Sequence, residues 1–194
     1  IEDGTAPQHV LDSVAAIAAR HRLFHWHLEF PEIFHVPEEG PANTATGWTG
    51  GFSAVLGNPP WETLQMSEKE FFASREPAIS EAKNAAERKR MIKALESSNP
   101  ALSGEFAVES RRGGAEVHLI RNSGRFPLCA TGKINTYSIF AEHFRSALAA
   151  EGRCGILTPT GLATDATTSA FFGDTLRTQR LAAFYDFENE SKIF

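Results

Sequence analysis

The sequence predicts an α/β fold with a central parallel sheet, because short apolar runs alternate with amphipathic helical patterns along the chain. Three runs, at residues 52–57, 153–158 and 181–187, are typical of buried strands. Their order, strand–helix–strand–helix–strand, implies right-handed crossovers and therefore parallel pairing. A chain of 194 residues, 42% of them hydrophobic, is long enough for one domain with a sizeable core.

The first 50 residues predict a helix, a strand and a loop. Apolar residues recur at helical spacing over residues 8–20. The aromatic-rich stretch at 24–34 alternates and is interrupted by Pro31, which fits a strand leading into a turn. Residues 36–50 are rich in Pro, Gly, Thr and Asn and predict a loop.

Residues 67–133 look like a mainly helical insertion into the core fold. Ser67 and Glu70 form a capping-box signature for a short helix, and Pro77 begins a second helix that runs to about Ser97. Residues 98–133 are the least regular part, with Gly113-Gly114 and Gly124 as expected breaks.

The regular pattern resumes after this segment. Asn135 or Thr136 is expected to cap a helix that Gly152 ends. A buried strand follows and stops at Pro159, and a further helix is expected from about residue 166 to 178, with Asp165 as its cap candidate.

The charge is unevenly distributed. The net charge is −5, but residues 83–133 hold ten Lys/Arg and five Glu, so this segment is +5 and the remainder −10. A basic patch on an acidic body can meet phosphates, and Arg88, Lys89 and Arg90 are the candidate DNA contacts. A solvated helix surface of mixed charge explains the same residues equally well.

Several classes of protein are disfavoured. No apolar run approaches 18 residues, so no membrane span is expected. The two cysteines, Cys129 and Cys154, lack a CxxC spacing and a secretory leader, which predicts reduced thiols in the cytoplasm. The seven histidines show no ligand spacing, so no metal site is expected.

The most informative residues are Asn58-Pro59-Pro60-Trp61, directly after the first buried run. In open α/β sheets, ligands bind at the carboxyl ends of the strands. The Asn58 side-chain oxygen and the Pro59 carbonyl could accept the hydrogens of an aromatic amine and free its lone pair for attack. The prolines would stiffen the turn, and Trp61 offers a flat face for a base. The alternative interpretation is a strand-ending turn with Trp61 as a core aromatic.

The tetrapeptide resembles the Asn/Asp/Ser-Pro-Pro-aromatic motif of amino-group methyltransferases that use S-adenosylmethionine. Other stretches match one family, at residues 24–34, 51–62, 135–142 and 152–159. From about His21 to Phe194 the chain resembles the large adenine-specific DNA methyltransferases of bacterial restriction and phage-defence systems, of the type IIG and BREX kind.

This resemblance implies a partial Rossmann-like methyltransferase sheet and methyl transfer from S-adenosylmethionine to the exocyclic amine of adenine in double-stranded DNA. It also implies restriction or phage-defence subunits as further partners. Asn58, Pro59 and Pro60 would form the catalytic turn and Trp61 would stack on a flipped-out adenine. The resemblance further assigns three weaker site residues: Asn135 and Tyr137 in the cofactor pocket, and Phe194 as a second aromatic beside the base.

One part of the family pattern is missing. A glycine-rich cofactor loop should precede Asn58, but the glycines among residues 1–50 are not in a strand-to-helix context, and no acidic residue is placed to hold a ribose. Residues 1–194 are therefore expected to be the catalytic half of a methyltransferase, a fragment inactive alone. Two alternatives stay open: a methyltransferase acting on a protein glutamine or an RNA base, and a non-catalytic domain that binds DNA or a partner.

Overall fold

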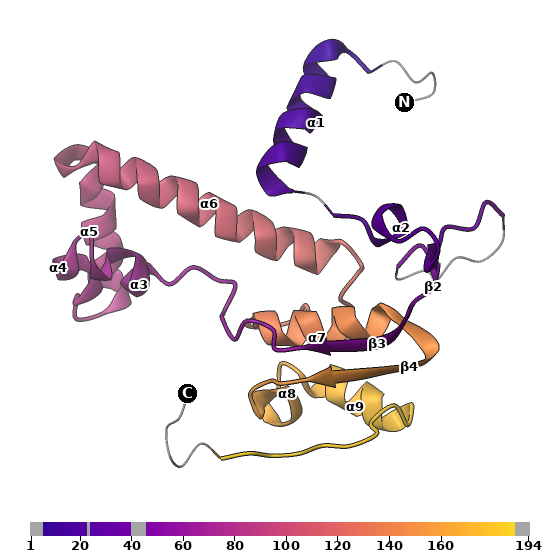
Figure 1. Ribbon diagram of the computed structural model, residues 1–194. Coiled ribbons are helices and arrows are strands. Elements are labelled where there is room, and N and C mark those ends of the chain that lie inside the picture. The colour runs from indigo at the N-terminus through magenta and orange to yellow at the C-terminus, as the bar shows by residue number, and fades with distance from the viewer. Residues whose placement is uncertain (1–5, 23, 40–45, 189–194) are drawn as a thin grey trace.

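The computed structural model describes residues 6–22, 24–39 and 46–188 (Figure 1). Helices dominate and the described strands are few. The elements in chain order are α1 (Gln8–His21), α2 (Trp26–Glu29), β1 (Phe34–His35), β2 (Thr49–Gly50), β3 (Phe52–Gly57), α3 (Glu68–Ala73), α4 (Pro77–Ser80), α5 (Ala85–Ser98), α6 (Pro100–Asn122), α7 (Thr136–Ser146), β4 (Leu148–Ile156), α8 (Gly161–Thr164) and α9 (Ser169–Arg177).

The parallel pair β3–β4 carries the main sheet of the described residues and confirms two of the three predicted strands. Val55 pairs with Cys154 and Gly57 with Ile156, while an irregularity lies between Phe52 and Ala54. A second small sheet pairs β1 with β2 in antiparallel fashion. The mixed α/β class is thus confirmed, whereas the Rossmann-like order stays a prediction.

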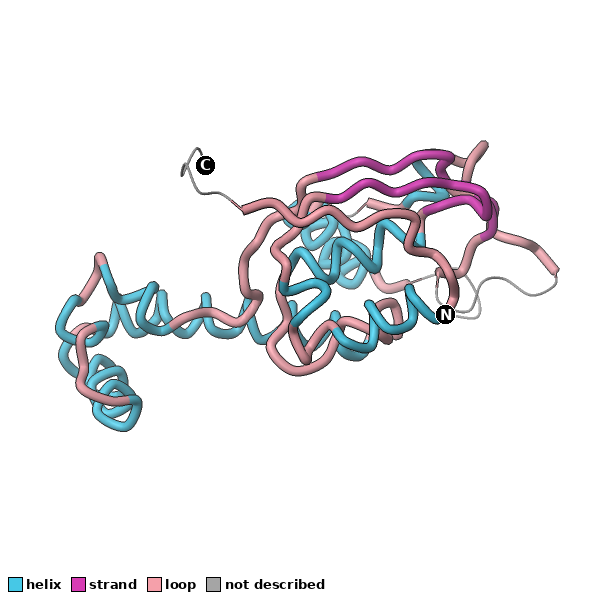
Figure 2. Tube along the Cα trace, turned by 90° about the horizontal axis from the view of Figure 1, so that it is seen from below, coloured by secondary structure: helices cyan, strands magenta, loops and turns pink. Residues whose placement is uncertain are grey.

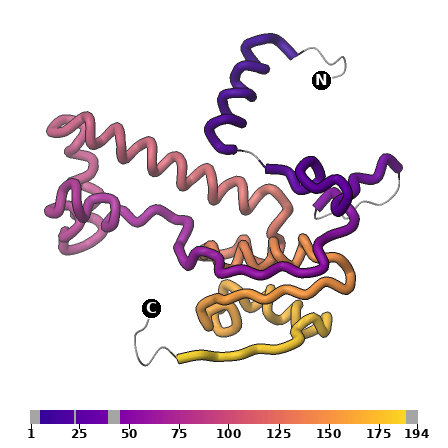
Figure 3. Tube along the Cα trace, in the orientation of Figure 1, coloured from indigo at the N-terminus to yellow at the C-terminus, as the bar shows by residue number. Residues whose placement is uncertain are grey.

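The predicted third strand at 181–187 is wrong. This segment has no strand assignment and runs as an extended yellow trace toward the C-terminus (Figure 3). Its apolar side chains are exposed, Tyr185 by 77% and Phe187 by 76%. An apolar run predicts a preference for burial, but a strand also needs a neighbour to complete its hydrogen bonds, and here no described strand pairs with it.

The aromatic stretch at 24–34 also differs from the prediction. It forms the single turn α2 and the two-residue strand β1 rather than a longer strand. Trp26, Phe30 and Phe34 recur every four residues and gather on one side, with Trp26 5.9 Å from Phe30 and 5.7 Å from Phe34 between ring centroids. Phe52 joins this aromatic cluster 4.9 Å from Phe34. Aromatic packing therefore outweighs the alternating pattern.

A side-chain hydrogen bond connects this aromatic cluster to α7. Trp26 Nε1 donates to His143 Nε2 over 3.0 Å. Burial, helped by the nearby Arg125, lowers the pKa of His143. The ring is therefore neutral near pH 7 and can accept this hydrogen bond at Nε2. By contrast α1, whose helical prediction is confirmed, has no buried residue.

The segment from α3 to α5 follows its sequence signals with one change. The Ser67 hydroxyl accepts from the Glu70 N–H, which confirms Ser67 as the cap of this helix. The expected single helix after Pro77 is instead divided into α4 and α5. Asn84 explains the division, because its side chain accepts from the Glu87 N–H over 2.9 Å and begins a new helix.

Helix α6 is the largest departure from the sequence prediction, because residues 98–133 were expected to be irregular. Its 23 residues span about 34 Å. Leu102 and Phe106 pack in a core with Phe71 and Phe72. At the other end of α6, the partly buried Val117 and Ile120 pack against a core that includes Tyr137, Leu162 and Phe171. Burial at both ends outweighs the cost of about 1 kcal/mol for each internal glycine. The helix connects the α3–α5 group to the rest of the molecule (Figures 1 and 2).

Helix α7 ends earlier than predicted and β4 starts in its place. Gly152 was expected to end the helix, but it lies inside β4, where an added Cβ would be 2.6 Å from the Phe52 carbonyl oxygen. Glycine is needed there because the two strands approach closely at their irregularity.

Glu142 of α7 is buried and accepts from the N–H groups of Leu128 and Cys129, and burial raises its pKa.

The C-terminal helices shift slightly from their expected bounds. The helix predicted from about residue 166 begins at Ser169, and Asp165 is the C-cap of α8 rather than the cap of α9. Arg145 of α7 contacts Asp174 of α9 over 2.7 Å, which ties the two helices together.

Within the described ranges, no helix is long and apolar enough to cross a membrane. No cluster of metal-ligating side chains occurs in the same residues.

Gly51 provides a test of the strand arrangement. Its φ is +145°, and an added Cβ would lie 2.4 Å from the backbone of Leu148 and Ala149. We expect Gly51→Ala to lower the free energy of unfolding by about 2 kcal/mol or more. Gly114→Ala is the control, because no atom lies within 4 Å of its added Cβ and helix propensity should raise stability by about 0.5–1 kcal/mol. Urea unfolding with equal midpoints for both variants would contradict this account.

Candidate functional site

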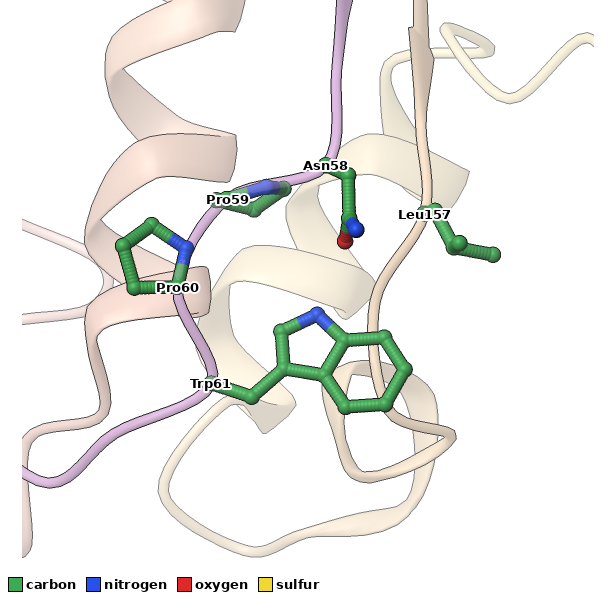
Figure 4. Close-up of a pocket in the computed structure, with 5 residues that line it drawn as sticks. All are labelled: Asn58, Pro59, Pro60, Trp61 and Leu157. Atoms are coloured by element: carbon green, nitrogen blue, oxygen red, sulfur yellow. The ribbon is translucent and has the colours of Figure 1, made fainter. Parts of the chain in front are cut away.

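The candidate site lies where the two parallel strands end. Asn58, Pro59, Pro60 and Trp61 follow β3 and, with Leu157 after β4, line an open hollow of about 650 Å³ (Figure 4). The Leu157 N–H donates to the Gly57 carbonyl over 3.0 Å and extends the pairing to the edge of the site. The tetrapeptide therefore occupies the carboxyl end of the sheet, where the sequence predicted it.

Trp61 is not a core aromatic. It is 48% exposed, whereas Trp48 is 4% exposed and fully part of the core. The Asn58 amide points toward the Trp61 indole across the hollow (Figure 4). Within the described part of the chain, neither the Asn58 side chain nor the Pro59 carbonyl has a hydrogen-bond partner. Polar acceptors and an aromatic face therefore converge on open space.

The N-terminus of α7 holds the tetrapeptide turn from behind. The Thr136 hydroxyl donates to the Pro60 carbonyl over 2.7 Å and accepts from the Glu62 N–H over 3.0 Å. The Thr136 N–H donates in turn to the Glu62 carbonyl over 2.8 Å. A bridge between Thr63 and Asn135 continues this contact. Residues just before and after Trp61 are thus fixed to one helix terminus.

Asn135 and Tyr137, the predicted cofactor residues, form an internal network. Asn135 Nδ2 donates to the Tyr137 hydroxyl over 3.2 Å, and that hydroxyl donates to Asp165 Oδ2 over 3.3 Å. Burial, followed by the Asp165 carboxylate, raises the pKa of Tyr137, which keeps the phenol protonated as a donor. Neither residue lines the hollow, so their cofactor role stays a prediction.

The predicted basic residues divide into paired and free side chains. Arg88 Nε lies 2.9 Å from Glu68 Oε2 and its side chain is only 13% exposed, so Arg88 ties α5 to α3. Arg90 is exposed and lies 4.0 Å from Glu87. Lys89 is exposed and has no ion pair within the described residues. Phe194, the predicted second aromatic, lies outside the residues that the structure describes.

Sequence reasoning missed two contributors to the site. Leu157 appeared only as the end of a strand, although parallel pairing places the residue after β4 beside the residue after β3. Thr136 was considered only as a helix cap, and no sequence signal identified its contact with Pro60.

Thr136 should control the rigidity of the turn. Thr136→Val removes the hydroxyl and leaves the Glu62 N–H without this acceptor, so we expect faster hydrogen exchange at Glu62 and a loss of about 1–3 kcal/mol in unfolding free energy. Thr136→Ser keeps the hydroxyl and should retain most of the protection. Equal exchange at Glu62 in the Val and Ser variants would show that the hydroxyl does not hold the turn.

Comparison with known proteins gives one family match. Residues 3–94 match the model of the Eco57I restriction-modification methylase family. This range includes β3 and the tetrapeptide turn. No curated protein and no solved structure gives a significant match. This match, over slightly less than half of the chain, is consistent with a restriction-modification methyltransferase and suggests a DNA methyltransferase.

Proposed function

We propose that this chain carries the base-binding half of an adenine-specific DNA methyltransferase that uses S-adenosylmethionine, in restriction-modification or phage defence in the cytoplasm. The observation that supports this proposal is the hollow at the ends of β3 and β4, into which Asn58 and Trp61 converge without a side-chain hydrogen-bond partner among the described residues. Residues 67–133 would be a helical insertion in this half.

Asn58 and Pro59 would act on the amine itself. In adenine the exocyclic amine donates its lone pair to the ring and is a poor nucleophile. Two acceptors, the Asn58 side-chain oxygen and the Pro59 carbonyl, would each take one N–H hydrogen bond and draw the nitrogen toward tetrahedral geometry. The lone pair would then point toward the methyl donor. Because these hydrogen bonds strengthen as the nitrogen becomes positive, they favour the transition state over the ground state.

Trp61 would hold the base. A duplex hides the adenine amine, so the base must leave the stack before it can reach Asn58. The half-exposed Trp61 indole supplies a face for stacking at the same hollow. Stacking of a base on an aromatic side chain is worth about 1–3 kcal/mol.

The described residues do not fit a complete S-adenosylmethionine site. Such a site needs backbone that can approach the cofactor at a glycine turn, but the glycines near the hollow are used in packing. A Cβ added to Gly50 would lie 2.0 Å from the Ile33 carbonyl oxygen, and one added to Gly51 would lie 2.4 Å from backbone atoms of Leu148 and Ala149. A Cβ added to Gly57 would lie 2.8 Å from the Phe144 ring. We therefore propose that the cofactor is held by residues outside the described part of this chain.

Calorimetry tests whether this chain binds the cofactor by itself. We expect the chain alone to bind S-adenosylmethionine weakly or not at all, since the glycine turn and the acidic ribose contact are both missing. A dissociation constant in the low micromolar range, about −8 kcal/mol, would contradict it. S-adenosylhomocysteine is the matched ligand control, because it shares the adenosine that the missing residues would hold.

Variants of the tetrapeptide test the catalytic roles in the assembled enzyme, with the cofactor site present. Asn58→Ala should lower kcat by about 100-fold or more with little change in DNA affinity. Asn58→Asp keeps an acceptor and should retain part of the rate. Trp61→Ala should lower kcat/KM by about 5- to 150-fold, the equivalent of one lost stacking contact, while Trp61→Phe should retain much of it.

Steady-state methylation of an adenine-containing duplex measures these effects, and 2-aminopurine fluorescence reports base extrusion. If Asn58→Ala methylates at the parental rate, the tetrapeptide is only a turn and the proposed function fails.

A further inference from the structure

A second hollow, of about 490 Å³, lies on the helical segment between α5 and α6 and is separate from the candidate site. Its polar lining comes from both helices. Lys89 and Lys93 stand on α5, and Ser103, Ser110 and Arg111 stand on α6. Lys89 and Lys93 are four residues apart, so they share one helix face about 6 Å apart along the axis.

The cations of this hollow differ from their neighbours in being free of acidic partners. Lys89, Lys93 and Arg111 form no ion pair with any described residue. Adjacent arginines are paired: Arg88 with Glu68 over 2.9 Å, and Arg112 with Glu109 over 3.5 Å. The hollow therefore gathers three cations that lack acidic partners among the described residues, beside arginines that are paired.

The acidic residues of the hollow do not cancel this charge. Glu68 and Glu96 also line it. Glu68 is already engaged by Arg88, which leaves Glu96 against three free cations. The apolar part of the lining comes from Ile92, Phe106 and Ala107. Phe106 packs 5.1 Å from Phe72 between ring centroids, which anchors its side chain in the helical core. The surface is thus positively charged and carries serine hydroxyls.

We propose that this α5–α6 hollow binds the phosphate backbone of duplex DNA. It deepens the proposed function by naming a second contact of the same substrate, and it rests on DNA being that substrate. Phosphate oxygens accept from Lys, Arg and Ser side chains, and such contacts hold a duplex without reading its sequence. Because one strand places a phosphate every 3.4 Å along the helix axis, the two lysines match about two phosphates of one strand.

The test measures duplex affinity against salt by fluorescence anisotropy, with the whole chain. Lys89→Gln/Lys93→Gln/Arg111→Gln removes the three free cations. Because each phosphate contact contributes about −0.9 to the slope of log affinity against log salt, the slope should become less steep by about 2.7. Between 50 and 200 mM salt the parent should then lose about 40-fold more affinity than the variant.

The matched control is Lys83→Gln/Arg90→Gln/Arg112→Gln, which removes the same charge from the same helical segment outside the hollow. Its slope should differ from the parental slope by less than about 0.9, the contribution of one phosphate contact. Lys89→Arg/Lys93→Arg/Arg111→Lys keeps the charges and should keep the parental slope. Equal slopes for the two Gln triples, or no duplex binding by the parent at 50 mM salt, would overturn the proposal.

Methylation separates this proposal from the proposed function. If the assembled enzyme binds duplex through the hollow but transfers no methyl group, the DNA contact stands and the methyltransferase proposal fails. If the Gln triple methylates with unchanged KM and its slope equals that of the parent, the hollow proposal fails and the methyltransferase proposal stands.

Discussion

The parallel pairing of β3 with β4 is the constraint on which the candidate site depends. It aligns the carboxyl ends of two strands that lie about 100 residues apart in sequence. Gly51 and Gly152 permit the close approach at the start of the pair, and the Leu157–Gly57 hydrogen bond closes its other end. The tetrapeptide then leaves the sheet at a fixed place, and Thr136 of α7 fixes its direction. The hollow between Asn58 and Trp61 results from these contacts.

The helical segment has a different structural basis. Its core around Phe72 is separate from the core around Tyr137, and α6 contributes side chains to both. A continuous helix between two cores sets the position of α5 and its lysines relative to the rest of the chain. The proposed DNA contacts on α5 and α6 would therefore be rigidly related to the base-binding hollow, as a protein that holds one duplex at two places requires.

Sequence patterns predicted local structure wherever the deciding interactions were local. The Ser67 capping box, the helices α1 and α7 and the strands β3 and β4 depend on spacing, caps and apolar runs. Prediction failed where tertiary contacts decided. Gly113 and Gly114 suggested a break within α6, but burial at both ends keeps it helical. The run at 181–187 had the composition of a strand but pairs with no described strand. At the site, the motif could be located from the sequence, whereas Thr136 and Leu157 could not, because their contacts cross the fold.

The most direct test of the central claim is a nuclear magnetic resonance titration of the labelled chain with millimolar adenosine. The three tryptophan indoles and the Asn58 amide provide separate signals. The account predicts saturable shifts at Trp61 and Asn58, with Trp26 and Trp48 unchanged. An adenosine whose exocyclic amine carries two methyl groups should still shift Trp61 but not Asn58, because it has no N–H to donate. If adenosine leaves Trp61 and Asn58 unchanged, or if both nucleosides shift Asn58 equally, the hollow does not hold the amine as proposed.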